Sequence, residues 1–436
     1  TSARHYTRKW DLQTAPSVCI HCGLGCNTIP CTRYGTMRRV ISRFNGDVNG
    51  YFLCDRGRYG YEFDALSFRF SQDAKSPDCG VEKARQILCE ARGVIGIGSP
   101  RASLEANYAL RRLVGGVNFS SGLSAFEQDG VETALNALRR GPARTPSLAE
   151  VELADVIVVL GVDPTNEAPM LDFAIRQAMR KAPLDIARKL KIPDWDANAV
   201  ATALQDAKGK LYIAAPWSTK ISEIAAGETV TSPVGVVEFA REIASALADG
   251  SGEVASELLN ARKPLIVTGI SAGVQTVRAA AELAWSLCDR GKDCGLFITV
   301  PEANTMGIGM MGGLSVDEAV RRVEAGEADT LVVLANDLSC RLSQSGWNIL
   351  ASKAKIIALD CVETATTREA AAVISIPTHF DDDGTLVNNE VRAQRFFSAR
   401  PSQDGVVPAW SALQDLCGGE QWQGYEDFLQ ALVREM

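Results

Sequence analysis

The sequence predicts an α/β fold in which a small cysteine-rich segment precedes doubly wound, mostly parallel α/β lobes. Three observations support this. Five of the twelve cysteines fall within the first 54 residues. From Val81 onward, short runs rich in Val and Ile recur with little polar alternation, which is typical of strands buried on both faces. Segments with helical spacing of apolar residues lie between these runs, and such alternation favours a parallel sheet.

Each element follows from its own stretch of sequence. Residues 1–65 are poor in long apolar runs, so this segment is expected to need a metal to fix its fold. Helices are expected at 102–114 and 170–181. Buried strands are expected at 93–98 (GVIGIG), 154–160 (ADVIVVL), 264–269 (PLIVTG), 328–334 (ADTLVVL) and 355–359 (KIIAL).

An internal repeat suggests how these elements are grouped. Residues 154–163 (ADVIVVLGVD) and 328–337 (ADTLVVLAND) agree at six of ten positions. The repeat predicts two related lobes, unless buried strands merely resemble one another in composition. With a linker at 248–253, the expected domains are a metal domain at 1–65, lobes at 66–250 and 251–400, and a C-terminal helical tail at 401–436.

Charge and composition exclude several classes of protein. The chain has 45 Lys and Arg against 53 Asp and Glu, a net charge of −8, which argues against a nucleic-acid surface. It has no apolar stretch long enough to span a bilayer. Twelve cysteines in 436 residues are too sparse for a disulfide scaffold, so a reduced interior in the cytoplasm is expected. The start at Thr1 suggests a processed or excerpted chain.

The cysteine spacing is the most specific signal. Three cysteines share one short loop, and the fourth follows after 27 further residues: Cys19, Cys22, Cys26 and Cys54. An iron–sulfur cluster with four iron corners needs one thiolate at each, and gaps of two and three residues let a single loop reach three of them. A four-cysteine zinc site is the alternative. Zinc sites usually use two separated Cys-x2-Cys pairs, so the spacing favours iron–sulfur.

Neighbouring residues fit the same site. Gly23 and Gly25 allow the backbone to turn sharply and to direct amides at the sulfurs. His21 is a candidate hydrogen-bond donor beside the ligands. Cys31 lies outside the spacing and is expected to be a packed thiol.

Two motifs carry a family resemblance. Residues 18–27 (VCIHCGLGCN) and 51–61 (YFLCDRGRYGY) resemble the cluster domain of molybdopterin oxidoreductases. The version here looks most like the large iron–sulfur subunit of bacterial NADH:quinone oxidoreductase, complex I. Supporting segments are 5–10 (HYTRKW), 34–43 together with Asn45-Gly46, and 384–396 (GTLVNNEVRAQRF).

The resemblance implies a molybdopterin-oxidoreductase-like fold and one 4Fe–4S cluster on Cys19, Cys22, Cys26 and Cys54. It further implies an electron-transfer and scaffold role in a respiratory translocase. The expected partners are other hydrophilic subunits of that complex. The expected location is the cytoplasmic side, peripheral to the inner membrane.

Three departures from active relatives predict that molybdopterin is absent and that the chain has no catalytic residues of its own. Arg56 stands where active relatives usually carry Lys. Asp163 and Glu167 place two carboxylates in a strand-end loop, where such folds bind nucleotide phosphates. Only forty residues follow the motif at 384–396, too few for the family's C-terminal barrel. The alternative is a catalytic molybdopterin-dependent protein such as a formate dehydrogenase.

Overall fold

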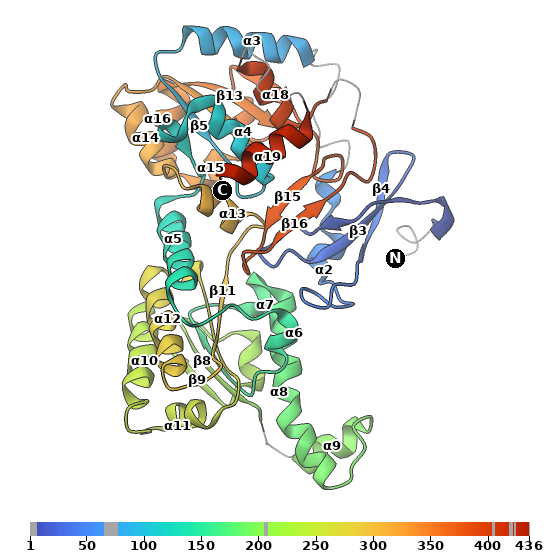
Figure 1. Cartoon of the computed structure of the whole chain (residues 1–436), viewed down its shortest axis with the longest axis vertical. Helices are drawn as coiled ribbons and strands as arrows, with labels where there is room; N and C mark the ends of the chain where they lie inside the picture. The colour runs from blue at the N-terminus through green and yellow to red at the C-terminus, as the bar shows by residue number, and fades with distance from the viewer. Residues whose placement is uncertain are drawn as a thin grey trace. The chain divides into compact units, whose positions relative to one another are not determined.

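The computed structural model describes residues 7–64, 77–204, 208–402, 406–417, 422 and 424–435. His5, in one of the motifs quoted above, lies outside the described residues. The chain divides into two units, whose elements are labelled in Figure 1. Unit 1 comprises residues 1–43, 55–128 and 302–436, and unit 2 comprises residues 44–54 and 129–301.

Unit 2 is built on a parallel five-stranded sheet with the order β11-β10-β7-β8-β9. Its strands are β7 (Val156–Leu160), β8 (Lys210–Ala215), β9 (Gly227–Val230), β10 (Pro264–Gly269) and β11 (Gly295–Thr299). Helices α10 (Pro233–Ala246) and α12 (Val274–Cys288) pack together on one face, and α8 (Pro169–Lys189) lies on the other (Figure 1). The shorter helices are α6 (Leu148–Val151), α7 (Pro164–Glu167), α9 (Ala197–Leu204) and α11 (Glu253–Asn260).

Unit 1 contains a second parallel five-stranded sheet, with the order β14-β13-β12-β5-β6. Its strands are β5 (Val94–Ile97), β6 (Phe119–Ser120), β12 (Thr330–Leu334), β13 (Lys355–Asp360) and β14 (Ala372–Ser375). Apolar side chains of α14 (Val316–Glu324) and α16 (Gln344–Lys353) form one core with this sheet. The remaining helices are α3 (Pro77–Glu90), α4 (Leu104–Val114), α5 (Ala125–Arg140, which runs on into unit 2), α13 (Thr305–Met311), α15 (Leu338–Arg341), α17 (Ala365–Arg368), α18 (Ala409–Leu416) and α19 (Tyr425–Glu435).

The two sheets have the same topology. In each, three consecutive strands run outward from the centre on one side, and two strands lie on the other. The repeated segments form the central strands β7 and β12. In unit 1 the two-strand side, β5 and β6, comes first in the chain, and most of unit 2 is inserted before β12.

The predicted α/β fold class and all five predicted buried strands are confirmed, as are both predicted helices. The predicted lobe boundary at 248–253 differs from the sheet topology, because β7 before it pairs with β10 after it. A buried apolar run indicates burial on both faces but does not specify its neighbours.

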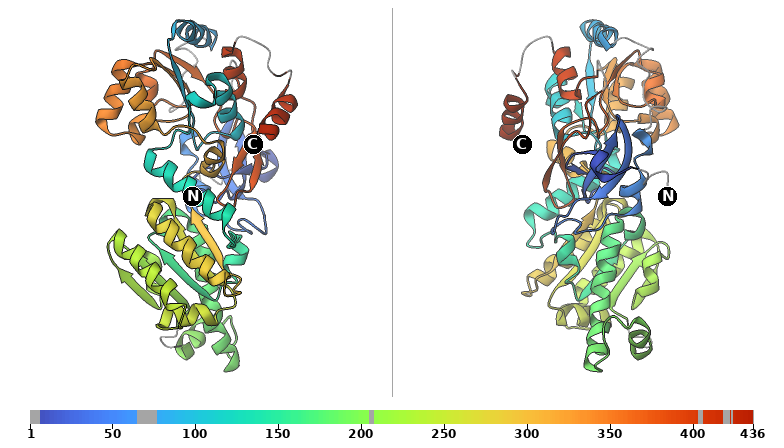
Figure 2. Two further views of the ribbon diagram at one scale, coloured as in Figure 1. Left: turned by 60° about the vertical axis from the view of Figure 1, so that its left-hand side comes forward. Right: turned by 90° about the vertical axis from the view of Figure 1, so that its right-hand side faces the viewer.

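The predicted metal segment forms a small antiparallel sheet in unit 1. Its strands are β1 (Gln13–Thr14), β2 (Ser17–Val18), β3 (Asn27–Arg33) and β4 (Thr36–Ser42). The hairpin of β15 (Gly384–Val387) and β16 (Ala393–Phe396) packs beside β2 (Figure 2). Val18, Leu386 and Phe396 share one apolar cluster there.

A buried ion-pair network links this small sheet to the C-terminal part of unit 1. Arg400 Nη2 lies 2.5 Å from Asp64 Oδ1, Arg400 Nε pairs with Asp381, and Arg400 Nη1 donates to Gly35 O over 2.7 Å. The three charged residues are at most 6% exposed. Asp381 is therefore a buried partner of Arg400.

Within the described part of the chain, no helix is both long enough and apolar enough to cross a membrane.

Candidate metal centre

A short antiparallel ladder closes the loop that carries Cys19, Cys22 and Cys26. β2 pairs with β3 up to the Val18–Asn27 pair, and Cys19 N donates to Cys26 O over 2.8 Å. Opposed residues of antiparallel strands have Cα atoms about 4.5–5.5 Å apart, so the ladder brings the two outer cysteines together. The three cysteines are 9%, 7% and 3% exposed. We call residues 19–26 the cluster loop.

Three consecutive carbonyl groups of the cluster loop accept hydrogen bonds from the β15–β16 hairpin. The pairs are Asn389 N to Gly23 O at 2.8 Å, Asn388 Nδ2 to Leu24 O at 3.2 Å, and Gln394 Nε2 to Gly25 O at 2.9 Å. In a planar trans peptide the N–H and C=O groups point in opposite directions. The peptide N–H groups that follow these carbonyls therefore point away from the hairpin.

Gly25 is required at its position for two reasons. Its φ of +63° lies in the left-handed region, and a Cβ atom there would lie 2.5 Å from Gln394 Nε2. Gln394 is fixed in turn, because its Oε1 accepts from Asn27 Nδ2 over 2.6 Å. Arg43 Nη2 donates to Asn27 Oδ1 over 2.9 Å and completes this buried chain.

Arg56, two residues after Cys54, reaches the cluster loop through its guanidinium. Its Nη1 lies 3.4 Å from His21 O, between the first two cysteines. Burial lowers the pKa of His21, and the positive charges of Arg56 and Arg101 lower it further. These effects favour a neutral His21 ring at neutral pH, while its role as a donor to the metal site stays a prediction.

A second histidine, which the sequence analysis did not single out, supports the strand that leads into the loop. His379 Nε2 lies 2.8 Å from Val18 O and 3.2 Å from Ser17 Oγ. Because a carbonyl can only accept, Nε2 carries the proton in the bond to Val18. Burial lowers the pKa of His379 to about 4, so the ring is neutral at pH 7.

The fourth predicted ligand, Cys54, lies outside the cluster loop, as the last residue of the 44–54 segment that groups with unit 2. It is partly buried, and the next residue begins α2 (Asp55–Tyr59), which packs against β4. Among the described residues, no group of three or more His, Cys, Asp or Glu side chains is arranged to hold a metal ion. The assignment of the four cysteines as ligands therefore stays a prediction. Cys31 is 1% exposed on β3, as expected for a packed thiol.

The strand ends of the unit 1 sheet form a second candidate site, because ligands of doubly wound sheets bind where the strand order reverses. Here that point lies between β5 and β12. Ser99 Oγ donates to Ala335 O over 2.8 Å, and Asn336 Nδ2 donates to Gly98 O and Gly122 O over 2.9 and 3.1 Å. We call this region, with Asn107, the strand-end crevice.

Asn107 fills the space beside Gly98. Its Oδ1 accepts from Ser99 N and its Nδ2 donates to Ser99 O, both over 2.9 Å. A Cβ atom at Gly98 would lie 2.5 Å from Asn107 Oδ1. Gly98, directly after β5, thus makes room for a side chain of the protein itself.

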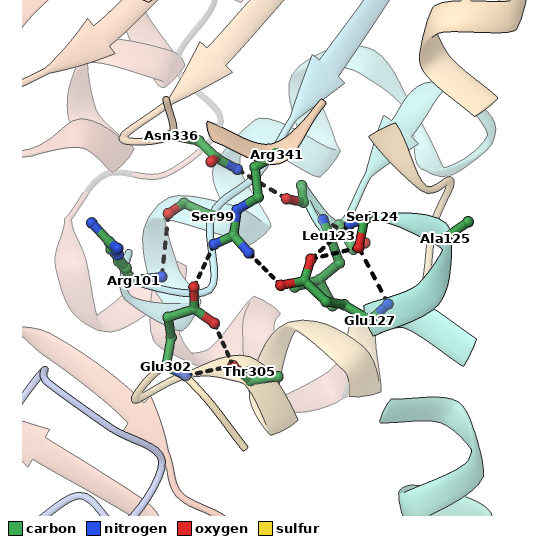
Figure 3. Close-up of polar contacts among 12 residues, drawn as sticks. Ser99, Arg101, Leu123, Ser124, Ala125, Glu127, Glu302, Thr305, Asn336 and Arg341 are labelled. Atoms are coloured by element: carbon green, nitrogen blue, oxygen red, sulfur yellow. Dashed lines mark hydrogen bonds and ion pairs between the residues drawn. The ribbon is translucent and has the colours of Figure 1, made fainter. Parts of the chain in front are cut away.

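Arg341, at the end of α15, is the cation of the strand-end crevice. Its Nη1 lies 2.7 Å from Glu127 Oε1 and its Nη2 lies 2.5 Å from Glu302 Oε1 (Figure 3). Glu127 also accepts from Ser124 N and Oγ, and Glu302 accepts from Thr305 Oγ1. The side chains of Arg341 and Glu302 are each 12% exposed, so the positive charge is mostly buried between two carboxylates.

In unit 2, the loop that follows β7 holds Asp163 and Glu167, the two carboxylates singled out in the sequence analysis. Asp163 caps α7 by accepting from Thr165 N over 3.0 Å. Glu167 Oε2 accepts from Ser271 Oγ and Thr299 Oγ1, each over 2.9 Å. Both carboxylates therefore serve contacts within unit 2.

The sequence analysis missed the side chains that act at long range. Gln394 and Asn388 lie in a motif that was quoted only for its resemblance, and their contacts with the cluster loop span more than 360 residues. The only local sign of these contacts in the sequence was the pair of adjacent asparagines in the motif at 384–396. Asn336 and Arg341 had no local signal, because their partners lie far away in the sequence.

Family models match both parts of the chain. Residues 12–64 match the molybdopterin oxidoreductase Fe4S4 domain, a range that includes all four predicted ligands. Residues 83–418 match molybdopterin oxidoreductase.

Curated relatives confirm the predicted resemblance. The chain is 39% identical over 423 residues to a subunit of NADH-quinone oxidoreductase from Salmonella typhimurium, covering 91% of this chain and 46% of the relative. It is 39% identical over 447 residues to the same subunit from Escherichia coli K12, covering 95% of this chain and 49% of the relative. The chain thus spans about half the length of the curated relatives it matches.

Solved structures support the fold alone. Acetylene hydratase from Pelobacter acetylenicus aligns with a TM-score of 0.63 at 11% identity, over 96% of this chain and 71% of that one. The formyltransferase/hydrolase complex from Methylorubrum extorquens aligns with a TM-score of 0.55 at 19% identity, over 83% of this chain and 97% of that one. Together with the two family matches, the parallel sheets and the cysteine-bearing hairpin establish that this chain belongs to the molybdopterin oxidoreductase family.

Proposed function

We propose that this chain is the iron–sulfur electron-transfer and scaffold part of an NADH:quinone oxidoreductase, with one 4Fe–4S cluster and no molybdopterin. The observation that carries the proposal is the closed, buried hairpin loop with three thiols inside the matched Fe4S4 region. The similarity to subunits of NADH-quinone oxidoreductase supports the assignment to a respiratory complex.

The donor types of the predicted ligands suit the cluster. Its four ligands would be Cys19, Cys22, Cys26 and Cys54, a donor set of thiolates alone. Such a set suits the iron corners of a cubane or a zinc ion and disfavours hard cations such as Mg²⁺ and Ca²⁺. When bound, the cluster supplies one-electron transfer. The chain excludes water by burying the loop, whose peptide N–H groups are further candidate donors to the sulfurs.

The proposed absence of molybdopterin is supported by the strand-end crevice. A nucleotide pyrophosphate in a doubly wound sheet needs free donors at the strand ends. Here Ser99 and Asn336 already join the ends of β5 and β12 to one another, and Asn107 on α4 occupies the backbone N–H of Ser99. Arg341 is neutralised by two carboxylates, which would repel an incoming dianion.

The same similarity also supports the proposed partners and location. We infer that the chain docks against other hydrophilic subunits on the cytoplasmic side, peripheral to the inner membrane. Electrons would pass between its cluster and neighbouring redox centres of that complex.

Metal and sulfide analysis of the purified full chain tests the proposal. We expect about four irons and an equal amount of acid-labile sulfide per chain, without molybdenum or tungsten. Stoichiometric molybdenum or tungsten would favour the catalytic alternative, a molybdopterin-dependent protein such as a formate dehydrogenase. A colourless protein with zinc and no sulfide would rule out the cluster and leave a zinc-binding module.

A further inference from the structure

Asn389, in the turn between β15 and β16, has a buried carboxamide without a partner. The residue is 1% exposed, and neither its Nδ2 nor its Oδ1 makes a hydrogen bond. Among the described residues, it is the only side chain with two such buried atoms. Buried polar groups in native proteins are almost always paired, so an unpaired carboxamide calls for a missing partner.

The position of Asn389 indicates where that partner lies. Its backbone N–H donates to Gly23 O over 2.8 Å, which fixes the residue against the cluster loop between Cys22 and Cys26. The next loop carbonyl, that of Leu24, is held by the neighbouring Asn388. The backbone of Asn389 thus contacts the residue that directly follows Cys22, one of the predicted ligands.

The neighbouring Asn388 shows that the turn itself does not need a second amide. Asn388 Nδ2 donates to Leu24 O, and its Oδ1 accepts from the backbone N–H groups of Glu390 and Arg392, each over 3.0 Å. These side-chain hydrogen bonds already shape the turn. The Asn389 carboxamide contributes none and is available for a ligand.

We propose that Asn389 Nδ2 donates a hydrogen bond to a sulfur of the cluster and thereby raises its reduction potential. This inference rests on the proposed function, because it requires a cluster on the loop. Reduction adds negative charge to the sulfurs, so a donor stabilises the reduced form more than the oxidised form. A carboxamide achieves this without changing the net charge of the site.

The first test uses the full chain with side-chain ¹⁵N-labelled asparagine. Pulsed electron paramagnetic resonance of the reduced wild-type protein should detect a ¹⁵N coupling to the cluster that disappears in Asn389→Asp. A reduced cluster without any asparagine side-chain coupling would overturn the inference, and this result does not depend on any variant folding. A wild-type chain without iron would instead overturn the proposed function.

The second test is a redox titration monitored by the same method. Asn389→Leu has a similar volume but no donor, so its equilibrium constant for reduction should fall about tenfold, ~59 mV for one electron. Asn389→Asp should fall further, because it adds a negative charge. The control is Asn348→Ala, which changes an exposed asparagine on α16 and should leave the potential unchanged. Full iron content with an unchanged potential in Asn389→Leu would contradict the proposal.

Discussion

The cluster loop and the strand-end crevice of unit 1 differ in whether the buried polar side chains beside them have hydrogen-bond partners. In the crevice, the side chains of Ser99, Asn107 and Asn336 are all engaged with the backbone of neighbouring strands. Beside the loop, the Asn389 carboxamide has no partner at all.

This difference separates a loop beside an unpaired buried carboxamide from strand ends whose polar side chains are already paired within the protein. Leaving a buried donor or acceptor unsatisfied costs about 1–3 kcal/mol, so a protein retains such a group mainly where a ligand recovers it. The crevice lies where nucleotides bind in doubly wound sheets, but its polar side chains are already paired. The Asn389 carboxamide beside the cluster loop still has unused hydrogen-bonding groups.

Removing one proposed ligand gives the largest expected effect. Cys22→Ala should lose nearly all the iron and unfold residues 15–60, while the two α/β sheets stay folded, because metal binding and folding are coupled in small metal domains. Limited proteolysis and iron content measure both effects. Cys31→Ala is the matched control, since Cys31 is equally buried but lies outside the motif. Equal protease resistance in Cys22→Ala and the wild type would argue against a structural role for the site.

The crevice is tested by removing its cation. Arg341→Ala leaves Glu127 and Glu302 without their shared partner, so the free energy of unfolding should fall by about 3 kcal/mol. Adding Glu127→Gln and Glu302→Gln should recover most of the loss. Arg321→Ala breaks the exposed pair with Glu318 and should change stability by less than about 1 kcal/mol. A loss in Arg341→Ala no larger than in Arg321→Ala would show that the crevice is not closed by charge.

His379, which bonds to the strand leading into the cluster loop, should make the stability of the chain depend on pH. His379 has a pKa of about 4 in the folded chain against 6.5 in model peptides, so between these values the unfolded chain binds more protons. Stability is therefore lost as the pH falls from 6.5 to 4, by about 3 kcal/mol in total. His379→Gln retains a donor for Val18 O but does not titrate, so denaturant unfolding should show a smaller loss over this range. Parallel curves for the two proteins would refute a buried neutral His379.

The smallest expected effect concerns the backbone of the loop. Gly25→Ala and Gly35→Ala both place a side chain at positive φ, which costs about 1–2 kcal/mol. Only at Gly25 would the added Cβ also meet Gln394, whereas nothing lies within 4 Å at Gly35. Thermal unfolding should therefore show a larger loss for Gly25→Ala. Equal losses would mean that Gln394 can move aside.

The sequence predicted those features that depend on local pattern. The run Val156–Leu160 is fully buried as expected, and the ladder before Cys19 explains why the cysteine spacing was informative. Strand neighbours were not predictable in this way. Val156 pairs with Pro264 on one side and Lys210 on the other, and nothing in the run itself distinguishes these partners.

The candidate sites show the same limit. Asn336 reaches Gly98 and Gly122 across more than 200 residues, so the closed crevice could not be seen before the fold was known. For the Asp163 loop, the sequence identified the carboxylates but not their engagement with α7 and its hydroxyl neighbours. A missing hydrogen bond such as that of Asn389 has no sequence signature at all.

The insertion of most of unit 2 before β12 has a consequence for synthesis on the ribosome. β5 emerges about 230 residues before its central partner β12, a delay of roughly 10–50 s at 5–20 residues per second. The inserted sheet, with all its strands between Val156 and Thr299, is complete before that partner exists. Nascent chains should thus form the unit 2 sheet first. Until β12 is synthesised, β5 and β6 of the unit 1 sheet depend on chaperones or transient contacts to avoid aggregation.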